Sequence, residues 1–205
     1  MAITNGYASL NQIKAALRIP TADAVDDGLL EMAVESASRL IDGYCNRTFI
    51  NAGTATRYYA THDPHVVQID DARSITSVEA SSSEDGIYDI SFDMTPHTGD
   101  IQPEPINDYI GGLVWPYTRL RAIGDYVFPI DRETTVKVTA SWGWPTVPTT
   151  VQQATIIQAS RIFKRLDSPL GVAGFGDLGV MRVSRGLDPD VAQLVEAYRR
   201  FTGVA

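Results

Sequence analysis

The hydrophobic period changes twice along this chain of 205 residues, and the change limits the folds that are open to it. Apolar side chains first recur every three or four residues, which predicts helices over residues 9–18 and 26–46. After about Thr54 they occur in short β-rich runs separated by turn residues. The helical period returns over residues 149–166 and again from Asp188. This order predicts an α+β protein with helices at both ends and strands between them.

Local signals mark the ends of these helices. Ser9, followed three residues later by Gln12, predicts a capping box. Asp188 before Pro189 predicts an N-cap and a first helical residue. The second helix should bury one apolar stripe, formed by Leu30, Ala33, Ala37, Leu40, Ile41 and Tyr44.

The middle of the chain predicts an inserted antiparallel β domain, whether barrel or sandwich. A turn cluster at residues 70–73 is expected to separate two of its strands. The strand-like runs cover residues 57–59, 65–69, 74–79, 87–92, 109–110, 118–123 and 134–140. The expected organisation is a four-helix core with two N-terminal helices (1–50) and two C-terminal helices (146–205), interrupted by the β domain (51–145).

Charge and cysteine content narrow the function classes. Residues 50–149 carry 14 of the 25 acidic side chains but only 6 of the 17 basic ones, and the net charge of the chain is −8. An acidic protein is a poor candidate for wrapping DNA, because phosphate contacts need Lys and Arg. Cys45 is the single cysteine, which fits a reducing cytoplasm, and its apolar helical pattern predicts a core residue. We expect no signal peptide and no membrane helix.

One stretch matches a cofactor motif by its letters. Residues 174–179 read G-x-G-x-x-G, but the dinucleotide site needs a strand before this pattern and a helix opening within it. Here a helix precedes it and residues 180–183 have a strand pattern. We interpret residues 168–187 as a Gly-rich arm, which is either a flexible loop or small hairpin, or a segment whose apolar side chains become ordered only against a neighbouring subunit.

No other motif indicates catalysis. His62, His65 and His97 all lie in the β region without the spacing of metal ligands, and none is paired with a nucleophile. We therefore expect no catalytic residues, no bound cofactor and no metal. The segment Trp142-Gly143-Trp144-Pro145 predicts a rigid turn that docks the β insert onto the helical core.

The two helical ends resemble the head-tail connector proteins of long-tailed double-stranded DNA phages. In residues 8–49 the resemblance rests on DDGLLEMAVESASRLIDGYCNRTF, with Tyr44, Arg47 and Phe49 at the family's aromatic and basic positions. In residues 140–202 it rests on WGWPTVPTTVQQATIIQASRIFKRLDSPLG and DPDVAQLVEAYRRF. The β insert lies outside the minimal family pattern.

The resemblance implies a non-enzymatic head-to-tail adaptor, a virion protein of the neck that is assembled in the host cytoplasm. It implies a homo-oligomeric ring of about twelve subunits, with unlike surfaces of neighbours in contact. The ring would bind the portal protein on one side and a head-tail stopper or tail terminator on the other. DNA would pass through its channel without specific binding.

Two parts of the chain are expected to make these contacts. Helix stripes such as Leu30/Ala37/Leu40 and Ile157/Phe163 would form the ring, or most of these residues would instead fill the core of the single chain. Residues 168–187 or the C-terminal helix would dock on the portal. The candidate residues at the portal or neighbour interface are Arg161, Phe163, Lys164, Arg165, Phe175, Leu178, Met181, Arg182, Val183, Tyr198 and Arg199.

Three alternatives stay open on sequence alone. The chain could be the stopper or tail terminator of the same connector, which attachment to the portal would distinguish. It could be a ligand-binding β module on a helical base, with binding retained by residues 50–149. It could also be a hydrolase that uses Asp or Glu, which a co-purifying metal or cofactor would indicate.

Overall fold

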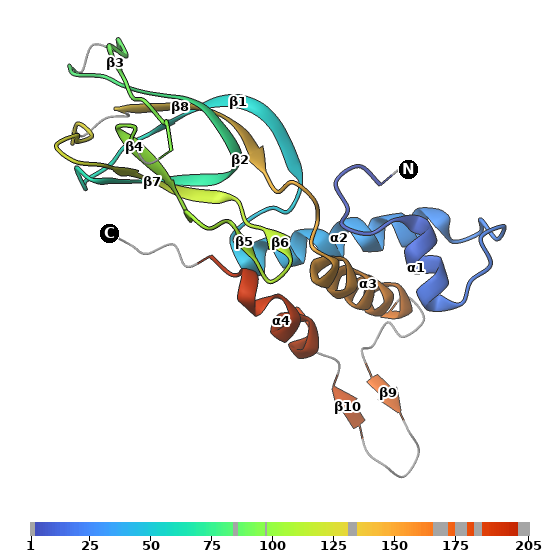
Figure 1. The fold of residues 1–205 in the computed structure, drawn as a ribbon. Coiled ribbons are helices and arrows are strands. Elements are labelled where there is room, and N and C mark those ends of the chain that lie inside the picture. Colours follow the sequence, from blue (N-terminus) through green and yellow to red (C-terminus); the bar gives the residue numbers. More distant parts are fainter. Residues whose placement is uncertain are drawn as a thin grey trace. The chain divides into compact units, whose positions relative to one another are not determined.

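A computed structural model of the chain, shown in Figure 1, describes residues 3–83, 86–96, 98–130, 135–165, 172–174, 180–182 and 186–200. The chain divides into a helical unit, Met1–Phe49 with Val147–Ala205, and a β unit, Ile50–Thr146. The β unit contains an antiparallel sheet. The predicted α+β class is therefore confirmed.

The helical unit follows the sequence signals closely at its helix starts. Its elements are α1 (Leu10–Leu17), α2 (Asp27–Cys45), α3 (Thr149–Lys164), and α4 (Pro189–Val195) with a 3₁₀ turn (Glu196–Tyr198). The capping box is confirmed, because Gln12 N donates to Ser9 Oγ (3.3 Å) and Ser9 N donates to Gln12 Oε1 (2.7 Å). Asp188 caps α4 as predicted, and its carboxylate accepts from Asp190 N at 2.8 Å.

The core of the helical unit lies among α1, α2 and α3. Its buried residues are Ala8, Ile13, Leu30, Ala33, Val34, Ala37 and Ala159. A second contact joins the far end of α2 to the end of α4. There Phe49 makes edge-on ring contacts with Tyr7 (5.6 Å between centroids) and Tyr198 (5.7 Å), and Arg200 N donates to Cys45 O at 2.8 Å. Segments far apart in the sequence thus close one unit.

The β unit is an antiparallel sheet in the order β1-β8-β2-β7-β4, with β3 also paired to β2. A separate hairpin pairs β5 with β6. The strands are β1 (Asn51–Tyr59), β2 (Val66–Ala80), β3 (Ile90–Ser91), β4 (Ile101–Glu104), β5 (Tyr109–Ile110), β6 (Leu113–Val114), β7 (Tyr117–Ala122) and β8 (Val136–Gly143). Valine, isoleucine and aromatic side chains from these strands, including Trp142, form its core.

The turn predicted at residues 70–73 is wrong, because β2 runs through it as one strand of 15 residues. Register shifts between Gln68 and Ala72 and again beyond it absorb the irregular residues as bulges. The two aspartates of this stretch, Asp70 and Asp71, form side-chain contacts with residues from other parts of the β unit. Asp70 pairs with Arg57 (2.6 Å), and Asp71 accepts from the Trp144 indole (3.1 Å).

The segment Trp142-Gly143-Trp144 is not a free-standing turn, because its first two residues end β8. Both indoles are buried and hydrogen-bonded inside the β unit, Trp142 Nε1 to Ala55 O at 2.8 Å. Gly143 has a φ of +92°, and a Cβ there would lie 1.9 Å from Ile50 O. Only glycine fits at this crossing of the two chain segments.

The Gly-rich arm contains two short antiparallel strands, β9 (Val172–Gly174) and β10 (Val180–Arg182). The hairpin interpretation is thus confirmed for these two strands. The G-x-G-x-x-G stretch begins in β9 and its remaining residues, 175–179, lie outside the described residues.

Candidate interaction surface

One face of α2 and the loop before it carry an apolar stripe that no described residue of the helical unit covers. Val25 is 89% exposed, Leu29 44%, Met32 55% and Leu40 41%. Among the described residues of this unit, these four are the large hydrophobic side chains with such exposure. Leu29, Met32 and Leu40 follow one another at three and eight residues along α2, which places them on one side of the helix, and Val25 lies in the loop just before it. We call them the α2 stripe. Exposed apolar patches of this kind mark interaction sites.

Small residues separate the bulky side chains of the α2 stripe. Gly28, Ser36 and Gly43 lie on the same side of the helix, and a Cβ built on either glycine meets nothing within 4 Å. The glycines are therefore not required by packing inside the chain, although glycine is a weak helix former. A face with bulky apolar groups and gaps between them suits close approach by another protein surface.

A buried lysine holds the loop that presents Val25. Lys14 Nζ donates to the carbonyls of Asp23 (2.7 Å) and Thr21 (3.3 Å) and forms an ion pair with Asp27 at the start of α2. Its side chain is 2% exposed. Because a buried ammonium needs all of these partners, the loop between α1 and α2 is fixed by its own carbonyls. Val25 is thus exposed on an ordered segment.

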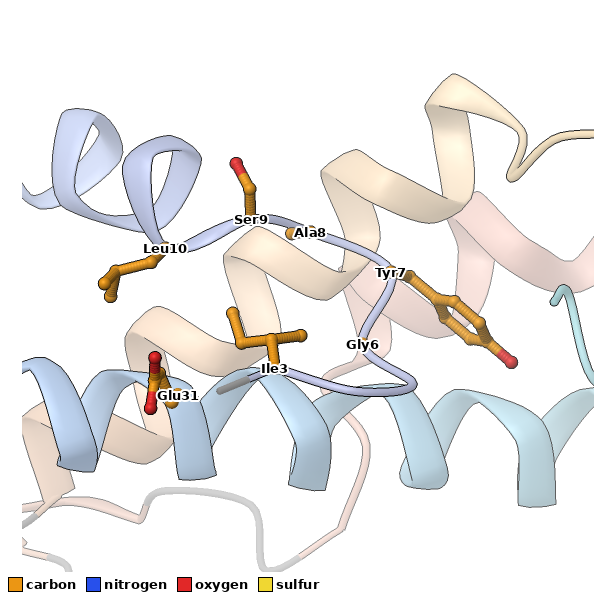
Figure 2. Close-up of a pocket in the computed structure, with 7 residues that line it drawn as sticks. All are labelled: Ile3, Gly6, Tyr7, Ala8, Ser9, Leu10 and Glu31. Atoms are coloured by element: carbon orange, nitrogen blue, oxygen red, sulfur yellow. The ribbon is translucent and has the colours of Figure 1, made fainter. Parts of the chain in front are cut away.

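A hollow lies on another side of α2, between this helix and the segment that leads into α1. It has a volume of about 380 Å³, opens widely to the surface, and is lined by Ile3, Gly6, Tyr7, Ala8, Ser9, Leu10 and Glu31. Figure 2 shows the side chains of Ile3, Leu10 and Glu31 directed towards a common space, whereas the Tyr7 ring points away. The hollow therefore combines an apolar floor with one carboxylate at its edge.

A polar network fixes the chain segment that lines this hollow. The Tyr7 hydroxyl donates to Asp42 and accepts from Phe49 N at 2.9 Å, while the Arg39 guanidinium pairs with Asp42 at 2.7 Å. Burial and the bond to the Asp42 carboxylate raise the pKa of Tyr7 well above its ordinary value. Burial also raises the pKa of Asp42, against the opposing effect of Arg39 and the Tyr7 hydroxyl.

The predicted interface residues on α3 already have contacts within the chain. Arg161 forms an ion pair with Asp188, whose side chain is almost fully buried, and so joins α3 to the start of α4. Phe163 is partly buried against the helical core. Lys164 is exposed at the end of α3, and Arg165 is half-buried directly after it. Of these four, Lys164 is the most available to a partner.

The predicted interface residues after α4 lie against the end of α2. Tyr198 is buried beside Phe49, so any part it has in an interface is indirect. The Arg199 guanidinium lies 5.1 Å from the centre of the Tyr44 ring and near Glu196. These contacts place Arg199 at the surface with partners of its own.

The remaining predicted residues belong to the Gly-rich arm. Met181 and Arg182 lie in β10, paired with residues of β9. Phe175, Leu178 and Val183 lie outside the described residues. The role of the arm in portal binding stays a prediction.

The expected ring stripe on α2 needs correction. Leu30 and Ala37 are fully buried in the core of the helical unit, so they are not surface contacts. Leu40 does face solvent, and Val25, Leu29 and Met32 accompany it. The predicted buried stripe of α2 also included Leu40, and this part of the prediction is wrong because Leu40 is 41% exposed.

The cysteine, the possible metal ligands and the helix lengths can each be compared with the expectations from the sequence. Cys45 is buried, which confirms it as a core residue, and burial raises the pKa of its thiol to about 12. Among the described residues no group of three or more His, Cys, Asp or Glu side chains could hold a metal ion. None of the described helices is long and apolar enough to cross a membrane.

Comparison with protein families gives a match over the N-terminal part of the chain. Residues 7–87 match the family described as phage gp6-like head-tail connector protein. This range contains α1, the loop held by Lys14, the α2 stripe and the first strands of the β unit. Over these residues the resemblance to head-tail connector proteins is therefore confirmed.

Comparison with solved structures shows the same fold across nearly the whole chain. Similar chains occur in the neck of an empty gene transfer agent (GTA) particle computed with C6 symmetry (TM-score 0.55, 17% identity) and in the virion of a native GTA particle (0.56, 17%). Another occurs in the neck of a native GTA particle computed with C12 symmetry (0.53, 16%). Each comparison covers 99% of this chain and 95% of the other. A search of curated proteins finds no match.

Proposed function

We propose that this protein is a structural component of the neck of a phage-like particle, where it acts as a head-to-tail adaptor. The observation that carries the proposal is the match of residues 7–87 to head-tail connector proteins. The fold shared with GTA neck and virion proteins supports it over the full chain. The uncovered α2 stripe supplies a surface for assembly.

In this proposal the subunits form a closed ring, with twelve copies as the expected number. Structures of the same fold occur in necks computed with C12 and C6 symmetry, which supports a ring of this size. The four helices would form the core of the ring. The ring would lie between the portal and the stopper or tail terminator, and DNA would pass through its channel.

Removal of the α2 stripe tests the ring. The double variant Leu29→Ser/Met32→Ser should raise the protein concentration needed for ring formation at least 10-fold, measured by native mass spectrometry and negative-stain microscopy. The matched control is Tyr109→Ser/Ile110→Ser, which removes two exposed apolar side chains from the β5–β6 hairpin. Rings that form normally from the stripe variant would contradict the assignment of this surface.

Attachment to the portal separates an adaptor from a terminator. Rings of the full chain should bind purified portal protein, and deletion of residues 168–187 should abolish that binding while the rings remain. Lys164→Glu provides a point variant for the same pull-down, since its side chain is exposed at the end of α3. Rings that bind tail proteins but no portal would favour the terminator instead.

A further inference from the structure

We infer that Asn5 and Gly6 form a site of spontaneous succinimide formation, and that Arg39 promotes this reaction. The reaction converts Asn5 to aspartate or isoaspartate with loss of ammonia. Both residues lie in the segment over residues 3–8, which runs along α2 in Figure 2 and which we call the N-terminal strap. The inference goes beyond the proposed adaptor and does not depend on it.

The sequence distinguishes Asn5 from the other asparagines. Asparagine stands at positions 5, 11, 46, 51 and 107, and only Asn5 is followed by a glycine. In this reaction the backbone nitrogen of the following residue attacks the side-chain amide carbon, so a glycine, which has no Cβ, hinders the approach least. Asn5 is also exposed, so water and base reach it.

Packing requires the glycine that makes Asn5 reactive. A Cβ at Gly6 would lie 2.6 Å from Ile3 Cγ2 and 2.8 Å from Val34 Cγ1. Val34 is fully buried in α2, where a close-packed interior leaves it little room to move. A larger residue at position 6 would therefore displace the strap.

The groups that react are free, although the backbone of Asn5 is held on both sides. Asn5 N donates to Glu35 Oε1 at 2.9 Å, and Asn5 O accepts from Arg39 Nη2 at 3.0 Å. In the described part of the chain, neither the side-chain amide of Asn5 nor the N–H of Gly6 has a hydrogen-bond partner. No existing hydrogen bond of these two groups has to break before the attack.

Arg39 lies where negative charge develops. Loss of the proton from Gly6 N creates an anion that is shared with Asn5 O, because both atoms belong to one conjugated peptide group. Arg39 Nη2 already donates to that oxygen, and a cationic donor placed at a developing oxyanion lowers its energy. The guanidinium is fixed in advance, since its Nε pairs with Asp42 at 2.7 Å and it lies 5.5 Å from the centre of the Tyr7 ring.

The reaction needs only water. Gly6 N forms a bond to Asn5 Cγ, the bond from Cγ to Nδ2 breaks, and the proton lost from Gly6 N leaves with ammonia. Water then opens the succinimide at one of its two carbonyl carbons. Attack at Cγ gives aspartate, whereas attack at the backbone carbonyl gives isoaspartate. The free carboxylate of isoaspartate contains the oxygen that Arg39 binds, so the same contact favours this product.

Isoaspartate would loosen the N-terminal strap, because it adds one methylene to the backbone after residue 5. Before this point, Thr4 N and Asn5 N donate to Glu35 Oε1 at 2.6 and 2.9 Å. After it, Tyr7 N donates to Ser38 Oγ at 3.0 Å. Glu35 and Ser38 lie one turn apart on a rigid helix, so the longer backbone does not fit both attachments.

Peptide mass spectrometry of the full chain, aged in neutral buffer, tests the site, and enzymatic methylation measures isoaspartate. Asn5 should convert at least about 10-fold faster than any other asparagine, because only its neighbour lacks a Cβ. Arg39→Gln should slow the conversion by about threefold or more in the native chain, and Arg39→Lys, which keeps a cationic donor, should recover part of the rate. In urea the unmodified chain and both variants should convert equally. Lys164→Gln removes an exposed positive charge of the same unit and serves as the control.

Hydrogen exchange tests the effect on the strap. The isolated isoaspartate form should lose protection at the amides of Thr4, Asn5 and Tyr7. Asn5→Asp carries the new charge without the extra methylene and should keep that protection.

Conversion at Asn5 no faster than at the other asparagines would overturn the site. Equal or faster conversion of Arg39→Gln in the native chain, or a difference that persists in urea, would overturn the role of Arg39. Unchanged protection in the isoaspartate form would overturn the loosening of the strap. None of these results bears on the proposed adaptor, which ring formation and portal binding test separately.

Discussion

The helical unit and the β unit place their ion pairs in different environments. In the helical unit, Lys14 (2% exposed) and Asp188 (3%) are buried where one helix connects to the next. In the β unit, Arg57–Asp70 and Lys137–Glu79 cross between strands with both partners partly exposed. Buried charges that bind backbone groups fix loops, whereas exposed pairs add little. The helical unit therefore uses buried charge to position its connections, and the β unit, apart from Glu104 with Arg119 and Arg121, relies on its apolar core and backbone.

The largest effect is expected where the β unit depends on backbone geometry alone. Gly143→Ala should lower the free energy of unfolding by about 3 kcal/mol, because its Cβ would overlap Ile50 O. The control Gly53→Ala shares a positive φ but has open space around it, and should cost about 1 kcal/mol. Urea denaturation measures both. Equal losses would show that backbone conformation, and not the close approach, limits position 143.

A smaller loss is expected for the buried charge of the helical unit. Lys14→Met should lower the free energy of unfolding by about 2 kcal/mol, since two loop carbonyls and Asp27 lose their partner. Lys164→Met changes an exposed lysine of the same unit and should stay within about 0.5 kcal/mol. If the two variants unfold alike in urea, the buried lysine does not fix the loop.

Glu104 gives a further test of the difference between the two units, because it is a well-buried carboxylate of the β unit that forms ion pairs with Arg119 and Arg121. Its hydrogen bond with Arg121, together with Arg119, lowers the pKa of Glu104, so its contribution to stability is present above its unfolded pKa and is lost as pH falls through the folded value. Glu104→Gln should cost about 1 kcal/mol at pH 7. The difference from the unmodified chain should shrink below about pH 4 in denaturation curves. A difference that is constant with pH would exclude the ionised carboxylate as its cause.

The smallest effect on folding is expected at the α2 stripe. Leu29→Ser/Met32→Ser should change the free energy of unfolding of the unassembled chain by less than about 0.5 kcal/mol. Leu30→Ala, in the same turn but fully buried, should cost about 3 kcal/mol. Thermal denaturation at low protein concentration compares them. A stripe variant as unstable as Leu30→Ala would mean that the stripe serves folding, not assembly.

Sequence reasoning succeeded where the determining contacts are local. The caps at Ser9 and Asp188 depend on residues two or three positions away, so their patterns predict them directly. It failed at β2, where bulges and the distant partners Arg57 and Trp144 keep the aspartates at residues 70–71 inside a strand.

The candidate surface was harder to predict for the same reason. The exposure of Val25 depends on Lys14, and the burial of Tyr198 depends on Phe49, which is far from it in sequence. Periodicity identifies an apolar face on a helix but does not show which of two faces the fold will cover. That choice is made by contacts between segments that the pattern of one helix does not contain.

The loop held by Lys14 has a consequence for the energetics of association. Ordering a flexible side chain at an interface costs about 0.5–1.5 kcal/mol of conformational entropy, and ordering loop backbone adds to it. The carbonyls of Thr21 and Asp23 are already fixed during folding, so a partner that docks on Val25 meets a preorganised segment. Binding there loses little entropy, and its rate should follow the frequency of correctly oriented collisions, not a folding step.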